Sequence, residues 1–448
     1  MRNHSSILIL ATTLMFAWNF SLSSRADDWW QLRGTASSGV VDSAKLPDRW
    51  SETENVIWKT PIDGRGWSSP IVVGNSVIVT TVVRSQGKPE EAKPGLYFGG
   101  DRKDVDQVVH SWRAICLDKA TGQVQWNKEL HAGVPSRPRH IKNSYASETP
   151  ASDGDHIYVL FGDLGLFCLN LDGEQVWKRE LPACKTRNDW GTAASPVFHA
   201  GRLYMVSDSE DASYLLALDA TTGQEIWKVD RDEKSNWATP FVWRNKLRTE
   251  IITPGTGKTR AYDLHGNQLY EFTGCSSITI AMPYAAGDLL YVSSGYVGDS
   301  KRPIYAIKPG ATGDISLKDG ETSNDFIAWC QPQGAPYNPS TLVYQGQLYV
   351  LHDRGLMAAY DALTGRTLYE KQRIPNGRSF TASPWANDGK IFCLNEFGET
   401  TVIQAGAEFQ VLHQNQLESK ELCMATPAAD GDRLVLRTGD AVYMIGVK

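Results

Sequence analysis

The chain has 448 residues and a mass of 49.6 kDa, with 41% hydrophobic and 21% charged residues. This apolar content is sufficient for a large core and excludes an intrinsically disordered chain. The formal net charge of −6 and the pI near 5.9 argue against a general nucleic-acid binder, which would carry a basic surplus. Fifteen Trp and 39 Gly favour a fold rich in sheets and tight turns.

The first 26 residues predict a secretory signal peptide. Arg2 and His4 form a short basic start, residues 7–20 are apolar, and Ser24 and Ala26 are small residues where a signal peptidase reads. The apolar stretch is shorter than a membrane span, so we expect cleavage after Ala26, with an uncleaved anchor as the alternative. The mature chain, 27–448, is then a single exported domain, periplasmic or extracellular, with 43 basic and 51 acidic residues.

One phrase recurs eight times along the rest of the chain: a small residue, then Pro, then a Gly-containing turn and an apolar strand. In one copy Ser340-Thr341 replaces the Pro pair. The phrases start at Ser69, Thr149, Ser195, Thr239, Met282, Ser340, Ser383 and Thr426. Their spacings are 80, 46, 44, 43, 58, 43 and 43 residues, which indicates a unit of about 44 residues with two insertions.

A second phrase, Leu-Asp-x-x-Thr-Gly-x-x-x-Trp, closes the unit. It reads in full at residues 117–126 and 218–227 and returns in part at 172–177, and weaker copies stand at 262–270 and 360–369. The Asp and Thr side chains bond their own backbone, Gly takes the positive φ, and the next strand begins at once. Each unit therefore predicts four short antiparallel strands, A to D, with the closing aromatic packed between neighbouring units.

The two ends of the repeat complete each other. The last unit, from Thr426, supplies only strands A, B and C before the chain ends, while residues 54–62 precede the first unit and place Trp58 where a D-strand Trp is expected. We therefore predict an all-β fold, an eight-bladed β-propeller of four-stranded antiparallel blades. Its ring is closed by an N-terminal strand that completes the last blade, which removes an open sheet edge.

The repeated Leu-Asp-x-x-Thr-Gly-x-x-x-Trp phrase resembles the repeat of the pyrroloquinoline quinone (PQQ)-like propeller family over residues 50–448. That family includes quinoprotein dehydrogenases and the propeller lipoprotein that assists outer-membrane protein assembly, so the resemblance implies a fold rather than an activity. Many of its dehydrogenases hold the quinone against a disulfide of adjacent cysteines, above a calcium ion in the ring centre, with an Asp as general base.

None of these dehydrogenase features can be matched residue by residue in this chain. Its seven cysteines, at 116, 168, 184, 275, 330, 393 and 423, include no adjacent pair, no CxxC and no haem-attachment motif. Other catalytic signatures are also missing from the sequence. We therefore assign no catalytic residue and no metal ligand, and expect Cys116 and Cys168 to be small buried residues.

The long insertions indicate where a binding site lies. Loops D–A and B–C emerge at one end of such a ring, and most long insertions, such as 84–107, 131–144 and 182–190, fall there. We expect a pocket at the ring mouth on this end, with stacking surfaces and convergent charges. Its candidate lining residues are Arg65, Trp67, His140, Lys142, Tyr145, Glu148, Asp189, Trp190, Trp237, Arg378 and Phe380. The alternative is that the aromatics only wedge between blades and the charges are solvated.

Three classes of function remain open. The first is a non-catalytic scaffold that binds a protein or a cell-envelope polymer. The second is a PQQ-dependent dehydrogenase with an atypical site, and the third is another enzyme, such as a sugar lyase, that uses the ring mouth. We expect the first: a monomer without a transmembrane segment, nucleic-acid partner or cofactor, with PQQ and calcium as the alternative cofactor set.

Overall fold

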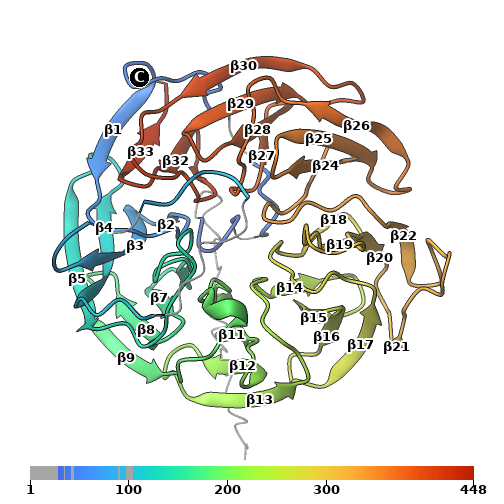
Figure 1. Cartoon of the computed structure of the whole chain (residues 1–448), viewed down its shortest axis with the longest axis horizontal. Coiled ribbons are helices and arrows are strands. Elements are labelled where there is room, and N and C mark those ends of the chain that lie inside the picture. The colour runs from blue at the N-terminus through green and yellow to red at the C-terminus, as the bar shows by residue number, and fades with distance from the viewer. Residues whose placement is uncertain (1–28, 35, 42–44, 89–90, 97–103, 448) are drawn as a thin grey trace, which may run out of the picture.

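The computed structural model describes residues 29–447, apart from 35, 42–44, 89–90 and 97–103. Eight sheets surround a central axis, and the chain visits them in order, so the colours run around the ring in Figure 1. The predicted eight-bladed β-propeller is therefore confirmed. The predicted signal peptide, 1–26, lies outside the described residues.

The first four blades follow the predicted A-to-D order from the axis to the rim. They consist of β2 (Ile71–Val73), β3 (Ser76–Arg84), β4 (His110–Asp118) and β5 (Val124–Gly133); β6 (Ala151–Ser152), β7 (His156–Phe161), β8 (Gly165–Asn170) and β9 (Gln175–Glu180); β10 (Val197–His199), β11 (Arg202–Ser207), β12 (Ser213–Asp219) and β13 (Glu225–Arg231); and β14 (Phe241–Arg244), β15 (Thr249–Pro254), β16 (Lys258–Tyr262) and β17 (Gln268–Thr273). A short 3₁₀ turn, η1 (Arg187–Asp189), precedes blade 3.

The next three blades are built in the same way, and the eighth joins the two ends of the chain. They consist of β18 (Tyr284–Ala286), β19 (Leu289–Ser293), β20 (Ile304–Ile307) and β22 (Ile327–Gln331); β23 (Leu342–Tyr344), β24 (Gln347–His352), β25 (Leu356–Asp361) and β26 (Thr367–Arg373); β27 (Trp385–Asn387), β28 (Lys390–Leu394), β29 (Glu399–Gln404) and β30 (Val411–Gln416); and β31 (Ala428–Asp430), β32 (Arg433–Arg437), β33 (Ala441–Ile445) and β1 (Val56–Pro61).

The predicted closure of the ring is confirmed. Strand β1 pairs antiparallel with β33, and Trp58 lies opposite Met444. The C–D loop of blade 5 adds a feature that the repeat did not predict. Its short strand β21 (Gly313–Asp314) pairs parallel with β17 and becomes a fifth strand of blade 4.

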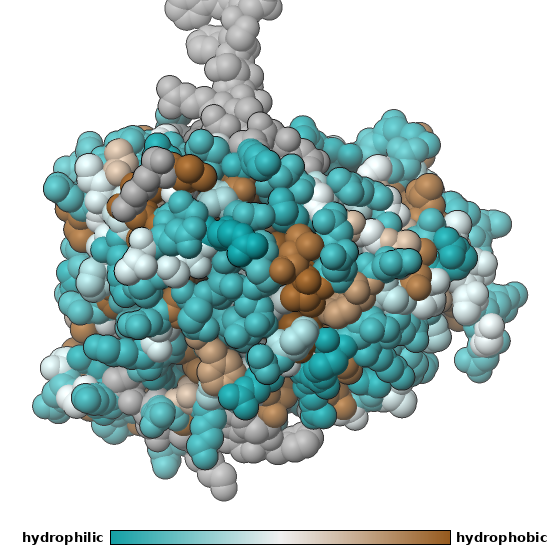
Figure 2. Space-filling view, turned by 90° about the horizontal axis from the view of Figure 1, so that it is seen from above, coloured by the Kyte–Doolittle hydropathy of each residue, from teal (hydrophilic) through white to brown (hydrophobic). Residues whose placement is uncertain are grey.

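The core lies between the blades. Strands B and C, such as β7 and β8, are almost wholly buried because blades pack against both of their faces. Strand D, as in β9, alternates between exposed and half-buried residues because it forms the rim. The edge of the disc seen in Figure 2 is accordingly mostly hydrophilic, with separate small apolar patches.

In the five blades whose D strand carries a Trp, that Trp docks onto the next blade, as predicted. The Trp177 indole N–H donates to the Ala220 carbonyl at 3.1 Å, and a Cβ at Gly223 would lie 2.6 Å from the Trp177 ring. This Gly also has a φ of +69°, so both the turn and the stacked ring require it. The same contact joins Trp58 to Gly122, Trp126 to Gly173, Trp227 to Gly266 and Trp329 to Gly365.

The hydroxyl of the Ser/Thr-Pro phrase has a role that the sequence did not show. It accepts a hydrogen bond from the backbone N–H at the same position in the preceding blade, which links successive inner strands. The six N–H-to-hydroxyl bonds, each 2.9–3.0 Å, run from Ser69 to Thr149, Thr149 to Ser195, Ser195 to Thr239, Met282 to Ser340, Ser340 to Ser383 and Ser383 to Thr426. Met282 has no hydroxyl and therefore cannot serve as an acceptor.

The described part of the N-terminal segment contacts the inner strands. Trp29 bridges to Val72 in blade 1, and Val40 bridges to Ala386 in blade 7. Between them, the buried Arg33 donates to the Thr341 carbonyl of blade 6 at 2.8 Å. The segment thus contacts the inner strands of blades 1 and 7 through its backbone and blade 6 through the Arg33 side chain.

Two further points concern the cysteines and helices that could span a membrane. Cys116 and Cys168 are buried, as predicted, and all seven cysteines are free thiols. Among the described residues, no helix is long and apolar enough to cross a membrane.

Candidate functional site

The ring end that carries the D–A and B–C loops, which we call the D–A face, is bridged across its centre. Lys142, in the loop before blade 2, reaches Glu396 in the B–C turn of blade 7, with Nζ 2.7 Å from Oε1 and 2.9 Å from Oε2. The Glu396 side chain is 1% exposed and also accepts from the Thr381 hydroxyl and the Gly95 backbone N–H. Residues from blades 1, 2 and 7 therefore meet in one buried ionic cluster.

Two more predicted residues lie beside this bridge. The Trp67 indole donates to the Lys142 carbonyl at 2.7 Å, and its ring packs with Leu422 in a small buried cluster. The Arg65 guanidinium lies over the Trp67 ring at 5.8 Å and pairs with Glu421 at 2.9 Å. These side chains fasten loops to one another.

A row of aromatic rings covers another part of the face. His140 stands edge-on to Trp190 at 6.0 Å, and Trp190 lies 5.8 Å from Trp237. The Trp237 indole donates to the Gly191 carbonyl at 2.6 Å. Asp189 belongs to η1 just before this row.

The two predicted residues of blade 7 lie apart from this row. Arg378 is exposed, with its guanidinium 4.8 Å from the Phe397 ring centre, and Phe380 is buried in the core. The predicted residues thus occupy several places on the D–A face.

A cleft opens between blades 2 and 3 on this face, and two predicted residues, Glu148 and Trp237, line it. We call it the blade 2–3 cleft; its empty space, including the part open to solvent, is about 460 Å³. Its other lining residues are Leu160, Gly162, Leu181, Cys184, Thr186, Thr192, Ala193, Ala194, Met205, Val206, Ser207, Asp208, Tyr214 and Asn236.

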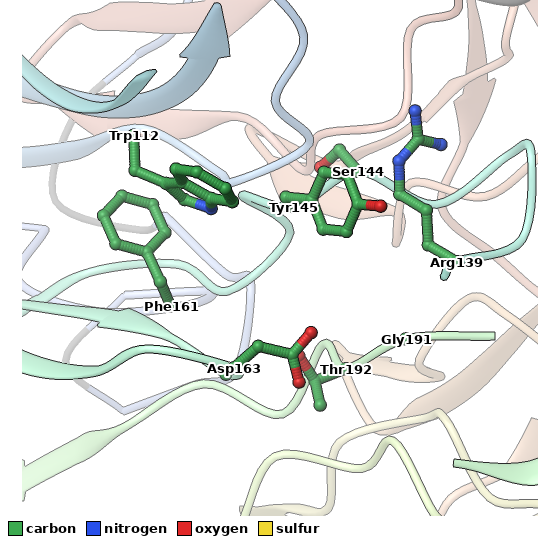
Figure 3. Close-up of a pocket in the computed structure, with 9 residues that line it drawn as sticks. Trp112, Arg139, Ser144, Tyr145, Phe161, Asp163, Gly191 and Thr192 are labelled. Carbon is green, nitrogen blue, oxygen red and sulfur yellow. The ribbon is translucent and has the colours of Figure 1, made fainter. Parts of the chain in front are cut away.

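A smaller hollow of about 270 Å³ adjoins it and shares Gly162 and Thr192. Figure 3 shows Trp112, Phe161 and Tyr145 as its aromatic side, with the Asp163 carboxylate near Thr192 on the opposite side. The Tyr145 hydroxyl donates to the Arg137 carbonyl at 3.0 Å and is therefore already engaged.

Glu148 has the most unusual environment in the cleft. It is 2% exposed, and its Oε1 accepts a hydrogen bond from the Thr192 hydroxyl at 2.5 Å. Burial raises the pKa of this carboxyl to about 7, and the hydrogen bond from Thr192 only partly opposes the rise. Gly162 packs close to both groups, since a Cβ there would lie 2.0 Å from the Thr192 oxygen.

Two other acids border the cleft system. Burial raises the pKa of Asp163 to about 6, against the opposing charge of Arg137. Asp208 is fully buried but is paired with Arg231 at 2.9 and 3.1 Å and accepts from the Asn236 amide. Asp208 is thus compensated, whereas Glu148 has no basic side chain within ion-pair distance among the described residues.

Several of these groups were not predicted from the sequence. Thr192, Asp163, Asp208 and Glu396 belong to no phrase, and their roles depend on contacts between blades. A signal for Glu148 was present, because the other seven units have a Ser, Ala or Pro directly before the Ser/Thr/Met of the first phrase. Aligning the units on that phrase would have marked Glu148 as the exception.

The donor set for a metal ion is sparse. In the parts of the chain that the structure describes, no three His, Cys, Asp or Glu side chains are grouped to hold one ion. The cleft instead offers a buried carboxyl, a hydroxyl and an apolar wall, which suits binding of an organic group.

Comparison with known proteins places this geometry in a family. The family model described as outer membrane protein assembly factor BamB matches residues 49–229, 110–271 and 212–446, which together cover nearly the whole described chain. This agrees with the resemblance seen in the repeated phrases.

Individual relatives are distant. A polyvinylalcohol dehydrogenase from Sphingopyxis sp. is 24% identical over 54% of this chain and 44% of its own length. An outer membrane protein assembly factor BamB from Alkalilimnicola ehrlichii is 25% identical over 51% of this chain and 49% of its own length. The matched part thus spans less than half of each of these curated relatives.

Among solved structures, a quinohemoprotein alcohol dehydrogenase from Comamonas testosteroni superimposes with a TM-score of 0.59, at 12% identity. The match covers 96% of this chain and 82% of that one. The computationally designed Ika8 protein gives a TM-score of 0.52, also at 12% identity, over 80% of this chain and 98% of that one. At such identity these likenesses establish the fold alone.

Proposed function

The chain belongs to the PQQ-like repeat family described as outer membrane protein assembly factor BamB, and we propose that it is a non-catalytic binding scaffold of the cell envelope. In this proposal the chain is exported as a monomer, and its D–A face binds a partner protein. Its acidic net charge disfavours nucleic acid as the partner.

The observation that carries the proposal is the buried ion pair that joins loops of blades 2 and 7 on the D–A face. The Lys142–Glu396 pair bridges the centre of the D–A face, and Arg33 lies among the inner strands. A ring-centre cofactor would have to displace these groups and leave Glu396 buried without its cation, which costs several kcal/mol. Loops held in this way on a rigid ring form a surface suited to a partner.

The described residues fit PQQ poorly. The cofactor is a tricarboxylate, whereas the blade 2–3 cleft is lined by Glu148 and Asp208, with Asp163 nearby. The adjacent-cysteine disulfide implied by the dehydrogenase resemblance has no counterpart, because all seven cysteines are free and none are neighbours. We therefore derive no redox step for this chain.

Export is supported by the sequence and by the family. The apolar stretch 7–20 with small residues at 24 and 26 has the pattern of a secretory signal. The matching family model carries the description of an outer membrane assembly factor.

A ligand-binding experiment separates the scaffold from the alternative dehydrogenase. The exported chain is heated with millimolar PQQ and calcium and, separately, without them. A ligand at 100 times its dissociation constant stabilises a protein by about 2.7 kcal/mol, which is readily seen as a rise in Tm. The scaffold proposal predicts no change in Tm, and a rise together with dye-linked alcohol oxidation would overturn it.

A second arm tests partner binding directly. The exported chain is immobilised and used to capture proteins from an envelope extract, with Trp190→Ala and the rim variant Glu180→Gln in parallel. A specific partner is expected to be retained by wild type and Glu180→Gln and reduced by Trp190→Ala. Equal retention by all three would place binding outside the aromatic row.

A further inference from the structure

Glu148 stands where the repeat uses only small or uncharged residues. The seven equivalent positions are Ser68, Ala194, Ala238, Ala281, Pro339, Ala382 and Ala425. These residues precede the inner strands, where successive blades are in hydrogen-bonded contact. A carboxyl at this point does not serve the repeated architecture, so another requirement must account for it.

The charge of Glu148 is not compensated within the described chain. Its hydrogen bond comes from the neutral Thr192 hydroxyl, and the basic groups nearest the cleft are committed elsewhere. Arg231 pairs with Asp208, and Arg137 lies 3.5 Å from Asp211. Arg139, which lines the adjoining hollow, donates to the Asn143 carbonyl at 2.6 Å and lies over the Tyr145 ring. An isolated buried carboxylate is unfavourable by several kcal/mol, so a cation entering the cleft would gain this interaction.

The walls of the cleft suit the stem of a long basic side chain. Leu160, Leu181, Met205 and Val206 provide apolar surface, and Trp237 also lines the cleft. Lysine and arginine bury their methylene stems against apolar groups while their head groups keep polar partners.

We propose that the blade 2–3 cleft binds a lysine or arginine side chain of the partner protein, with Glu148 as its counter-ion. The inference rests on the proposed scaffold function and names the chemistry by which the partner is recognised. Glu148 and the Thr192 hydroxyl meet the head group, and the apolar wall meets the stem.

Other ligand classes fit the cleft less well. An anion would face Glu148, Asp208 and the neighbouring Asp163. The cation that lines the adjoining hollow, Arg139, donates to the Asn143 carbonyl at 2.6 Å, and Arg231 and Arg137 are paired with Asp208 and Asp211. A neutral apolar group would bury Glu148 further without any compensation. Charge complementarity therefore selects a basic side chain.

The test uses Nα-acetyl-lysine amide and Nα-acetyl-arginine amide, with Nα-acetyl-norleucine amide as the uncharged match for lysine. Binding to the exported chain is followed by NMR titration at pH 8, where the Glu148 carboxyl is ionised. At least one basic amide is expected to bind at least tenfold more tightly than the norleucine amide, with shifts at Thr192 and Trp237. Binding of the norleucine amide as tightly as both basic amides, or no binding of either basic amide, overturns the inference.

Matched variants locate the interaction. Glu148→Gln is expected to weaken binding of the basic amide at least tenfold, whereas Glu180→Gln on the exposed rim of the same blade leaves it unchanged. Unchanged binding in Glu148→Gln contradicts the proposal. The comparison of the lysine and norleucine amides on wild type decides the question if a variant fails to fold.

Partner capture keeps the two proposals apart. If Glu148→Gln still captures the wild-type partner while the basic amides do not bind, this inference fails and the scaffold function stands. A Tm rise with PQQ and calcium, together with dye-linked alcohol oxidation, removes the scaffold function whatever the cleft binds.

Discussion

Glu396 and Glu148 are two buried carboxyls on the same face of the ring, and they differ in what surrounds them. Glu396 is enclosed by Lys142, Thr381 and a backbone N–H, so its charge is paired. Glu148 accepts a hydrogen bond from Thr192 but has no cation among the described residues. The comparison indicates that the first carboxyl holds loops together, whereas the second is kept for a ligand.

The largest expected effect comes from removing the cation of the paired site. Lys142→Met leaves Glu396 buried without a partner and is expected to lower the free energy of unfolding by about 3–5 kcal/mol in urea titrations. Lys246→Met, which breaks an exposed pair with Asp288, is the control and should cost less than about 1 kcal/mol. Equally small losses of unfolding free energy in the two variants would show that the Lys142–Glu396 ion pair does not stabilise the loops of the D–A face.

The unpaired carboxyl of Glu148 should make the free energy of unfolding depend on pH. The pKa of Glu148 is raised from 4.5 to about 7 in the folded state, so the folded protein holds this proton more tightly than the unfolded chain. Stability is therefore lost as pH rises from about 4.5 to 7, on the order of 3 kcal/mol from this group. Glu148→Gln should show a smaller loss over the same range.

The free energy of unfolding of the Glu148→Gln variant should still fall somewhat as pH rises. Burial also raises the pKa of Asp163 and of Asp353 to about 6, and both act in the same direction. Identical slopes for wild type and Glu148→Gln would contradict the assignment of an unpaired buried carboxyl.

A smaller change tests the single hydrogen bond of Glu148. Thr192→Val keeps the shape of the side chain but removes the hydroxyl, which favours the ionised carboxyl. The pKa of Glu148 should rise by about one unit, corresponding to about 1.4 kcal/mol, as read from carboxyl ¹³C shifts against pH. A pKa that stays the same would mean that Thr192 does not donate to this group.

The smallest expected loss of unfolding free energy comes from removing one hydrogen bond between neighbouring inner strands. Such a bond lies near each of the two carboxyls. Ser195→Ala removes the acceptor of the Thr149 N–H beside Glu148, and Ser383→Ala removes the acceptor of the Ser340 N–H near blade 7. Each is expected to cost about 1 kcal/mol in urea unfolding. A clearly larger cost at Ser195 would show that the two regions also differ in their backbone framework.

Much of the fold could be predicted because it is repeated. The Gly and Trp of the second phrase make the same docking contact in blade after blade, and the unpaired ends of the chain required closure. The addition of β21 to blade 4 was missed because a two-residue parallel pairing leaves no pattern in the sequence.

The candidate site was less predictable because it depends on departures from the repeat. Lys142 and Glu396 are 254 residues apart and carry no shared motif, so only the closed ring brings them together. Trp67 and Lys142 could be placed on the correct face, but their contacts with other loops could not be read from residue type. Glu148 was named for its position before an inner strand, and only the structure reveals that it is buried without a cation.

The most direct test of the central claim is a hydrogen-exchange footprint of the exported chain with its captured partner. The account predicts protection of residues 137–148 and 184–192, which border the blade 2–3 cleft, and little change in the C–D turns. Protection confined to the C–D turns or the outer D strands, with the D–A face unchanged, would contradict it.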